Sequence, residues 1–493
     1  MKKFITCILA ILMIAVPLAA CGNGNTENSE ISENSESLQC TTPVKDLGGR
    51  QINVLCHDFS AGVQLLFGYT GEIIYSEENP SAVDDAKKIV CDYVESAYNC
   101  DIEGELTSIV YGTDVVTLVK NQVTSGMHQY DIVFDTLGRA PTLALEGMLV
   151  DLKSISTIDL SKPWWDQNAV NDLSMAGKVF FINGDINTYD DQGTWCVLFN
   201  KSLKNRLGIN EDFYQLVRDD KWTFDKFVEI CSESKATFDS TGDGIQDEKD
   251  NWAFGTETYN IYIHLAGAGI KIAEKDENDL PVLTAIASPD QTYSLLSEVL
   301  DFYNQPELVM VANTEPYLSK GFPNVYEATV HTAFLEGREL FYMCGLMNGP
   351  SFRVMTDEFG ILPIPKHYET QNRYYHTISS YNSTVLMIPE GTPDTEDLGL
   401  VISALAELSK QRVTPAYYDV QLKYRDTRDS ESGEMLDLIF ASRTFDLGCY
   451  YNWGGVRDLY TDIDPNVASR FENKIHIAQG AMDEFIDTVL AKK

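Results

Sequence analysis

The feature that most constrains the fold is an alternation of strand and helix patterns over residues 49–152. The stretch GRQINVLCHDF alternates apolar Ile52, Val54 and Cys56 and then ends in polar residues, as a strand does at its carboxyl end. The next stretch, SAVDDAKKIVCDYVESAYN, keeps its apolar residues at helical spacing. Two further strand-helix pairs follow, CDIEGELT with VVTLVKNQVTSG and YDIVFDTLG with APTLALEGMLVDL. This order predicts an α/β fold, a parallel sheet covered by helices.

A second region with the same organisation begins near Thr188. GTWCVLFNKSLKNRLGI predicts a strand that runs into a helix, and KWTFDKFVEICSES predicts an amphipathic helix. The helix in SPDQTYSLLSEVLDFYNQP has Ser288 as N-cap, Pro289 at its first position and Gln291 placed to complete a capping box. Because the chain has 493 residues, which is too long for one core, we expect two or three domains.

The N-terminus carries a targeting pattern. A basic start precedes an apolar run from Phe4 to Val16, which is too short for a membrane span and suits a secretory signal. Leu18-Ala19-Ala20-Cys21 resembles a bacterial lipobox, in which the cysteine takes a diacylglycerol and becomes the new N-terminus. Residues 1–20 are therefore predicted to be a signal peptide and Cys21 a lipidation site. The alternative is an ordinary signal peptide with a chance cysteine at the cut.

Residues 21–45 are predicted to be the lipidated cysteine and a flexible tether. Between Gly22 and Ser37 the chain holds one Ile and no aromatic residue, too little apolar surface to offset the entropy lost on ordering. The whole chain has a formal net charge of −37, which repels phosphate backbones and argues against nucleic-acid binding. The cysteines beyond Cys21 form no CxxC motif, so we expect mostly buried thiols, with Cys91 and Cys100 as the pair to examine first.

Five motifs in order carry a family resemblance. They are YDIVFDT…LALEGMLVDL, WCVLFNKSL with its Asn200-Lys201 pair, FLEGRELFYMCG, FGILPIPK and TRDSESGEMLDLIFASRTFDLG. From about Leu47 to the C-terminus, the chain resembles the sugar-type extracellular solute-binding proteins of bacterial ABC importers. The resemblance implies a two-lobed periplasmic-binding-protein-like fold of type II, with discontinuous lobes joined by crossing hinge segments. Lobe 1 would comprise residues 46–187 plus 378–447, and lobe 2 residues 188–377 plus 448–493.

The same resemblance implies a binding protein and not an enzyme. It would be a monomer, lipid-anchored at the extracytoplasmic face of the cell membrane, that captures a small-molecule solute, a carbohydrate, between its lobes and delivers it to ABC permease subunits. Two alternatives stay open. The solute could be a peptide or a polyol, or the chain could be a lipid-anchored glycoside hydrolase, because an acidic chain can place two carboxyls at the separation that hydrolysis needs.

Candidate ligand-binding residues follow from two rules. Ligands of open α/β sheets bind at the carboxyl ends of strands, where Asp58 and Asp135 lie. Sugar sites combine flat rings with carboxylates and amides. The complete set is Asp58, Asp135, Asp190, Trp195, Tyr381, Asn382 and Trp453. For any single tryptophan the alternative is core packing. No catalytic residue and no organic cofactor is predicted, because the sequence has no GxSxG, HExxH, P-loop or GxGxxG motif.

The stretch DSTGDGIQDEKD, residues 239–250, resembles a calcium-binding loop. Its oxygen ligands would be the side chains of Asp239, Thr241, Asp243, Asp247 and Asp250 and the backbone carbonyl of Ile245. Gly244 stands at the sixth position, where such a loop turns sharply. The alternative is a solvated acidic turn. Clustered carboxylates repel one another without a cation, so we expect a structural calcium ion.

Overall fold

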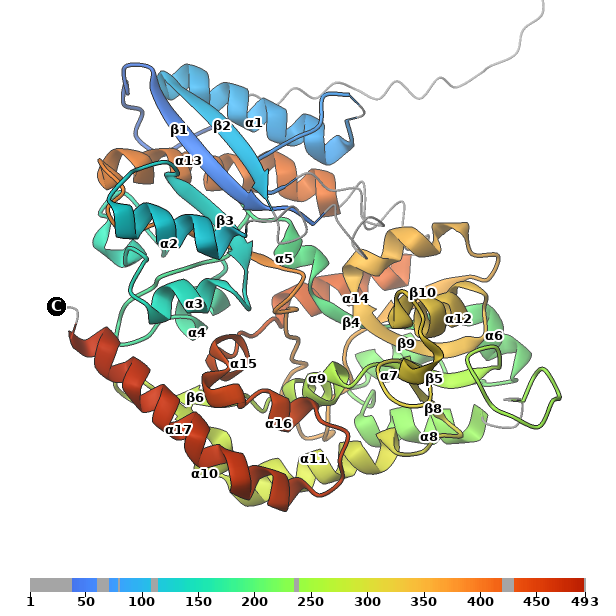
Figure 1. The fold of residues 1–493 in the computed structure, drawn as a ribbon. Coiled ribbons are helices and arrows are strands. Elements are labelled where there is room, and N and C mark those ends of the chain that lie inside the picture. Colours follow the sequence, from blue (N-terminus) through green and yellow to red (C-terminus); the bar gives the residue numbers. More distant parts are fainter. Residues whose placement is uncertain are drawn as a thin grey trace, which may run out of the picture. The chain divides into compact units, whose positions relative to one another are not determined.

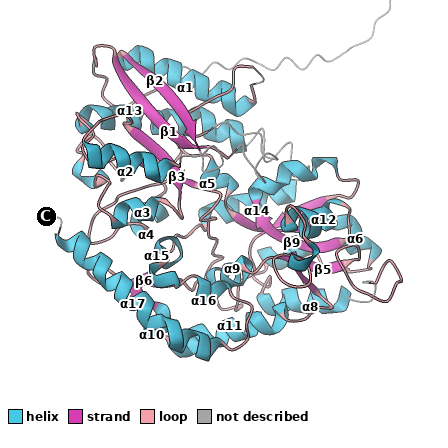
Figure 2. Ribbon diagram, in the orientation of Figure 1, coloured by secondary structure: helices cyan, strands magenta, loops and turns pink. Residues whose placement is uncertain are grey.

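The strands form two larger sheets and one short pair (Figures 1 and 2). This holds for the part of the chain that the computed structural model describes, residues 38–59, 71–78, 80–107, 114–234, 239–418 and 430–491. The predicted signal peptide, Cys21 and most of the tether lie outside the described residues. Both sheets are mixed, since each has parallel strands and an antiparallel partner.

The first sheet has the strand order β11-β3-β1-β2. Its strands are β1 (Arg50–His57), β2 (Cys100–Thr107), β3 (Ile132–Thr136) and β11 (Thr384–Met387). β1 pairs in parallel with β2 and β3, whereas β11 runs antiparallel to β3. The alternation of strand and helix in the sequence therefore gives the predicted parallel sheet, and a strand from far along the chain completes its edge.

The helices of the first sheet begin and end where the sequence indicates. α1 (Ala82–Tyr98) starts with a capping box between Ser81 and Asp84 and ends at Asn99 in the left-handed conformation. α1 packs along α13 (Thr395–Pro415), while α2 (Val115–Ser125) contacts β1 and β3 and also α3 (Ala140–Leu145). Apolar residues of these helices, such as Val90 and Val94, are fully covered and form the core with the sheet.

The second sheet has the order β10-β4-β9-β5-β8. Its strands are β4 (Trp195–Asn200), β5 (Trp252–Thr256), β8 (Val309–Val311), β9 (Glu339–Gly345) and β10 (Phe359–Leu362). β9, β5 and β8 are parallel, and β4 lies antiparallel between β9 and β10. Phe254 of β5 and Phe341 of β9 are buried together with Trp222 and Phe227, and the four rings form one group of contacts.

The remaining described elements lie outside the two larger sheets. They are η3 (Leu152–Ser154), α4 (Gln167–Asp172), α5 (Tyr189–Gln192), α6 (Lys201–Arg206), α7 (Phe213–Arg218), α8 (Phe224–Ser234), α9 (Tyr259–Gly267), β6 (Ala273–Lys275), β7 (Pro281–Leu283), α10 (Thr284–Ala287), α11 (Pro289–Tyr303), η5 (Leu318–Lys320), η6 (Glu327–His331), α12 (Thr332–Leu335), η7 (Leu346–Val354), α14 (Ser430–Ala441), α15 (Leu447–Tyr451), η9 (Trp453–Gly455), α16 (Asp458–Thr461) and α17 (Val467–Ala491).

One predicted cap is wrong. α11 has Pro289 at its first position as expected, but Ser288 makes no side-chain cap hydrogen bond. The short helix α10 ends at Ala287, so Ser288 joins two helices and its backbone N–H already donates to the Thr284 carbonyl. Its backbone angles differ from the extended ones that a capping residue adopts.

The strands of the first sheet lie in the residue ranges predicted for lobe 1 and those of the second sheet in the range 188–377 predicted for lobe 2, whereas one helix packs across this division. α14 lies within the range predicted for lobe 1, yet it packs against β10 of the second sheet. Ser432 of α14 accepts a hydrogen bond from the Ile361 N–H of β10 at 3.1 Å, and Arg218 of α7 forms an ion pair with Glu434 at 2.7 Å. Residues 39–493 group as a single compact unit by their contacts, and the lobe boundaries stay a prediction.

Two crossing segments run side by side between the sheets. Residues 193–195 lie antiparallel to residues 377–379, because the Ser379 N–H donates to the Gly193 carbonyl at 2.8 Å and the Trp195 N–H donates to the Thr377 carbonyl at 3.2 Å. The first segment leads into β4 and the second leads toward β11. Connections of this kind are what the resemblance implies for hinge segments.

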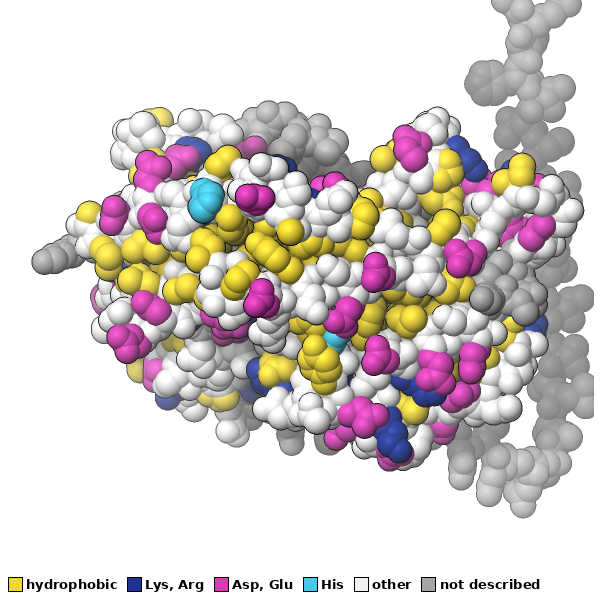
Figure 3. All heavy atoms as spheres, turned by 90° about the horizontal axis from the view of Figure 1, so that it is seen from below, with side chains coloured by type: hydrophobic (Ala, Val, Ile, Leu, Met, Phe, Trp, Pro, Cys, Tyr) yellow, Lys and Arg dark blue, Asp and Glu magenta, His cyan; other side chains and the backbone are white. Residues whose placement is uncertain are grey.

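The surface and the thiols agree with the composition. Figure 3 shows Asp and Glu side chains spread over the face seen from below. All eight cysteines of the described residues are free, and only Cys40 is not fully buried, which confirms the expectation of buried thiols. Cys91 and Cys100 are not bonded to each other. Among the described helices, none combines the length and the apolar composition needed to cross a membrane.

Candidate functional site

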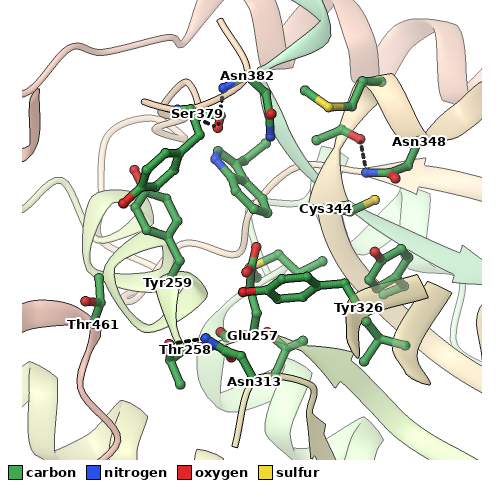
Figure 4. A pocket seen from close by; sticks show the side chains of 18 of the residues that line it. Glu257, Thr258, Tyr259, Asn313, Tyr326, Cys344, Asn348, Ser379, Asn382 and Thr461 are labelled. Atoms are coloured by element: carbon green, nitrogen blue, oxygen red, sulfur yellow. Dashed lines mark hydrogen bonds between the residues drawn. The ribbon is translucent and has the colours of Figure 1, made fainter. Parts of the chain in front are cut away.

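A cavity of ≈ 450 Å³ lies at one edge of the second sheet (Figure 4). Thr256 ends β5, Gly345 ends β9 and Asn313 follows β8, and all three line the cavity. Because β5, β8 and β9 are parallel, their carboxyl ends meet at this edge. β4 is antiparallel to β9, so its first residue, Trp195, lies opposite Gly345 at the same edge. The position is the one where open α/β sheets bind ligands.

The opposite wall comes from residues 379–382, which precede β11. The Gly138 N–H donates to the Ser380 carbonyl at 2.7 Å and the Leu137 N–H donates to the Ser383 carbonyl at 3.0 Å. Gly138 is needed there, since an added Cβ would lie 2.9 Å from the Ser380 carbonyl oxygen. These bonds hold the segment on the carboxyl edge of the first sheet, just after β3. The cavity therefore has the second sheet on one side and a segment attached to the first sheet on the other.

Aromatic rings form much of the cavity wall. The rings of Trp195 and Tyr259 stack with their centroids 5.7 Å apart, and Tyr381 meets Tyr259 edge-on at 6.0 Å. Trp195 is only 6% exposed, whereas Tyr381 is 56% exposed. A half-open ring offers a flat apolar surface that a ligand can cover. The Trp195 indole nitrogen is buried and has no hydrogen-bond partner among the described residues.

Polar groups stand among the rings. Arg457, beside α16, donates to the Tyr381 hydroxyl at 2.8 Å and to the Ser380 hydroxyl at 3.2 Å, and its guanidinium lies 5.1 Å from the centre of the Tyr381 ring. Asn313 donates to the Thr258 hydroxyl at 2.8 Å. Figure 4 shows Tyr259 and Tyr326 on either side of Glu257, whose carboxyl points into the space between them. This mixture of donors, acceptors and rings suits a polyhydroxylated ligand.

Glu257 is the most perturbed acid of this wall. It follows β5 directly and is half-buried. Withdrawal from water raises the pKa of its carboxyl from 4.5 to about 7, and a hydrogen bond with Tyr326 opposes the rise. At neutral pH the group is therefore divided between a form that donates a hydrogen bond and a form that only accepts.

The structure brings together three of the predicted site residues and adds others. Trp195, Tyr381 and Asn382 all line the cavity. Sequence reasoning missed Glu257, Tyr259 and Arg457. A signal for Glu257 was present, because it is the first polar residue after the apolar strand WAFGT, and the rule that selected Asp58 and Asp135 applies to it equally. Arg457 had no such signal, since it follows a short irregular turn.

Asp58 and Asp135 lie at the carboxyl edge of the first sheet but do not line the cavity. Asp135 has no exposed surface and lies 3.4 Å from His57 Nδ1 and 3.3 Å from Arg139 Nε. Burial raises the pKa of Asp135 to about 6 and lowers the pKa of His57 to about 4. The Asp135 carboxyl is covered by protein in this structure, and its contact with a ligand stays a prediction. Asp58 is half-buried, and its N–H donates to the Thr107 carbonyl at 2.9 Å.

Asp190 and Trp453 also lie away from this cavity. Asp190, in α5, lines a second cavity, where burial raises its pKa well above the usual range and Arg443 opposes the rise. Trp453 is 3% exposed and stacks on Tyr451 with centroids 5.0 Å apart, beside Phe485 of α17. The neighbouring Gly454 lies so close to α17 that an added Cβ would be 2.9 Å from the Ala478 backbone. Trp453 is therefore a core residue, and the alternative of packing is the one realised.

The predicted calcium loop precedes β5, and its carboxylates accept hydrogen bonds from the loop itself. Asp239 accepts from the N–H groups of Gly242 and Gly244, and Asp250 accepts from those of Thr241 and Asp247. Lys320 forms an ion pair with Glu248. No three His, Cys, Asp or Glu side chains come together as a metal site anywhere in the described parts of the chain. In this conformation the loop is held by its backbone donors, and the calcium site stays a prediction.

Comparison with solved structures identifies the fold. A galacto-N-biose/lacto-N-biose I-binding protein of an ABC transporter from Bifidobacterium longum, in complex with lacto-N-biose, is 11% identical with a TM-score of 0.58, over 90% of this chain and 99% of that one. An ABC substrate-binding protein of Listeria monocytogenes in complex with cycloalternan is 12% identical with a TM-score of 0.53, over 90% and 99%. UgpB from Mycobacterium tuberculosis, in complex with glycerophosphocholine, is 15% identical with a TM-score of 0.53, over 86% and 100%.

The chain thus has the two-lobed, periplasmic-binding-protein-like fold of ABC substrate-binding proteins, as predicted. The structural neighbours are binding proteins, and several of them hold sugars. No protein-family model and no curated protein matches the chain. Identities this low support the fold alone, so the ligand must be argued from the cavity.

Proposed function

We propose that this chain is the extracytoplasmic substrate-binding lipoprotein of an ABC importer and that it captures a carbohydrate in the cavity at the edge of the second sheet. The observation that carries the proposal is the wall formed by Trp195, Tyr259 and Tyr381 together with the polar groups of Glu257 and Arg457. Rings cover the C–H faces of sugars, while carboxyl, amide and guanidinium groups bond their hydroxyls.

The lobes support a capture mechanism. In the proposed cycle, a sugar that touches the second sheet and the 379–382 segment at once binds the closed arrangement more tightly than the open one. A ligand shifts a conformational equilibrium only by such a difference in affinity. The crossing segments 193–195 and 377–379 would then act as the hinge, and the closed form would be presented to the permease subunits.

A ligand screen tests the proposal. Melting temperatures are measured with mono- and oligosaccharides, short peptides and polyols, and every positive result is followed by calorimetric titration. A bound ligand raises the melting temperature by mass action, by an amount that corresponds to about 2.7 kcal/mol at one hundred times its Kd. The proposal expects at least one saccharide to bind. Binding of a peptide or a polyol alone would instead support the alternative solute classes.

A glycoside hydrolase is the rival function from another class. Two carboxyl residues, Glu257 and Asp458, line the cavity, and the raised pKa of Glu257 would suit a general acid. The same saccharides that bind are incubated with the protein and analysed by chromatography. The binding-protein proposal expects every saccharide to be recovered intact. Hydrolysis would be established if the parent forms cleavage products and Glu257→Gln does not.

The lipid anchor is proposed on the sequence LAAC and the tether that follows it. The parent and Cys21→Ser are expressed in a bacterium that processes lipoproteins, and the cells are fractionated. The parent should be found with the membrane fraction and the variant in the soluble fraction. Equal membrane retention of the two proteins would exclude Cys21 as the anchor.

Structural calcium in the 239–250 loop is proposed on the spacing of its oxygen ligands. Removing calcium with a chelator should lower the melting temperature of the parent, and Asp243→Ala should remove that response. Asp243 is chosen because, among the described residues, its carboxyl accepts a local hydrogen bond from the Ile245 N–H at 2.8 Å. Asp92 is an exposed residue of α1, so Asp92→Asn serves as the matched control and should respond to the chelator like the parent. A parent that ignores both added calcium and the chelator would contradict the proposal.

A further inference from the structure

A second cavity, of ≈ 320 Å³, shares none of its described lining residues with the first. Its wall comes from three parts of the chain. Residues 163–191 supply one side, α13 with the turn after it supplies another, and α14 with Arg443 supplies the third. A volume of this size accommodates a small organic molecule.

The wall of the second cavity is acidic. It carries the carboxyl groups of Asp166, Asp185, Asp190, Asp191 and Asp437. The basic groups of the same wall are Lys410 and Arg443. Arg443 donates to Asp166 at 2.8 Å and to Asp191 at 2.7 Å, and Lys410 lies 3.1 Å from Asp185. Burial raises the pKa of Asp190 well above its usual range, yet the carboxyl groups of the wall still outnumber its two basic groups, so the composition favours a cation over an anion.

Buried polar atoms that lack a hydrogen-bond partner are an observation separate from the acidic composition of the wall. Among the described residues, Asp190 Oδ1, Asn187 Oδ1 and Trp165 Nε1 are buried and have no hydrogen-bond partner, and all three residues line the cavity. Their side chains are almost wholly covered, with 1%, 2% and 2% of the residue surface exposed respectively. Buried polar atoms are nearly always hydrogen-bonded, so these atoms indicate a missing partner. Two of the three are acceptors, which call for a donor.

A ring surface favours an organic cation over a bare ion. Trp165, Tyr418 and Phe440 line the cavity, and the Arg443 guanidinium already lies 5.5 Å from the Phe440 ring centre. Aromatic faces attract cations of this kind. A divalent metal is disfavoured, because no group of three metal-ligating acidic, His or Cys side chains forms within the described residues.

We propose that the second cavity is a binding site for a small organic cation that bears a primary ammonium group. The ammonium would donate to Asp190 Oδ1 and Asn187 Oδ1, which are the unsatisfied acceptors, and its carbon chain would lie against Trp165 and Phe440. The proposal stands apart from the proposed carbohydrate function, since the two cavities have separate walls.

Calorimetric titration with 1,4-diaminobutane tests the proposal, and 1,4-butanediol is the neutral probe of equal length. The parent should bind the diamine and not the diol. Asp190→Asn keeps the shape of the side chain but cannot ionise beside an ammonium group, so it should weaken diamine binding at least ten-fold. The exposed Asp92→Asn, on α1, makes the same chemical change elsewhere and should leave diamine binding unchanged.

A second variant keeps the proposal testable if Asp190→Asn does not fold. If Asp190→Asn does not fold, Asp437→Asn on α14 removes another charge from the wall and should weaken diamine binding several-fold. Failure of the parent to bind the diamine, equal binding of the diol, or unchanged binding in a folded Asp190→Asn would each overturn the proposal. Weakening by Glu257→Gln and not by Asp190→Asn would place the amine in the first cavity and would overturn it as well.

Discussion

The carboxyl edges of the two sheets contain similar residues in opposite situations. At the edge of the first sheet, Asp135 is fully covered and lies beside His57 and Arg139. At the edge of the second sheet, Glu257 is half-buried and faces a cavity. Burial raises the pKa of both carboxyls, to about 6 and about 7 respectively. A raised pKa at a strand end therefore occurs both in a covered position and beside an open cavity, and the shift alone does not separate the two situations.

The largest expected effect concerns Trp453, which lies outside both edges. If its packing against Tyr451 and Phe485 is structural, Trp453→Ala should lower the free energy of unfolding by about 3–5 kcal/mol. Binding of the ligand by the folded fraction should remain near that of the parent. Denaturant unfolding and calorimetric titration measure the two quantities. A stable variant with a large binding defect would return Trp453 to the binding site.

The next largest effect is the pH dependence of stability that the covered carboxyl of Asp135, at the edge of the first sheet, should cause. The folded protein keeps a proton on Asp135 up to about pH 6, whereas an unfolded aspartate releases it near 3.8. The folded state thus binds more protons between these values, and the contribution of Asp135 to stability falls as pH rises through them. Asp135→Asn cannot ionise, so its stability relative to the parent should rise by up to about 3 kcal/mol between pH 4 and pH 7.

Urea unfolding of the parent and Asp135→Asn at several pH values measures this difference. His57 has a lowered pKa and gives the opposite slope, and it lies 3.4 Å from Asp135, so the same comparison is repeated in a His57→Gln background that removes this titration. A difference in stability that stays constant from pH 4 to pH 7 would show that Asp135 is not held in a protonated, buried state.

The next prediction concerns Tyr381 and tests whether its exposed ring, in the cavity at the edge of the second sheet, contacts the ligand. Its ring is 56% exposed, so Tyr381→Ala should leave the melting temperature close to that of the parent. If the ring stacks on the ligand, the affinity should fall by about 1–3 kcal/mol. Tyr381→Phe keeps the ring and loses only the hydroxyl that bonds Arg457, so its defect should be smaller. Equal affinities for Tyr381→Ala and the parent would remove Tyr381 from the binding surface.

The smallest effect concerns Glu257. A carboxylate accepts a stronger hydrogen bond from a sugar hydroxyl than a neutral acid does, by about 1 kcal/mol. Affinity of the parent for its sugar should therefore increase as pH rises through about 7, and the increase should vanish in Glu257→Gln. Titrations at pH 5.5 and 8.5 compare the two proteins. An identical pH dependence in both would mean that another group controls it.

The sequence predicted the fold well because its signals are local. Apolar alternation and helical spacing located β1, α1, β2, α2 and β3. The edge partner β11 and the place of α14 depend on contacts between residues far apart in the chain, which no local pattern contains. Ser432 of α14, for example, bonds Ile361 of β10 across 71 positions.

The candidate site was predicted in part for the same reason. Trp195, Tyr381 and Asn382 were found from rings beside polar residues at the crossing segments. Trp453 shows the same local pattern, yet α17, which follows it, covers its ring. Whether an aromatic residue faces a cavity or a helix is decided by packing between distant segments, and the sequence around Trp453 does not reveal it.

The central claim is that the cavity at the edge of the second sheet binds a carbohydrate. A crystal structure of the protein with the saccharide that binds best in the ligand screen tests it most directly. The account predicts sugar density in the first cavity, against Trp195 and Tyr381, with hydroxyls within hydrogen-bond distance of Glu257 or Arg457. Density for the sugar anywhere else on the molecule would contradict the claim, as would a screen in which no saccharide raises the melting temperature.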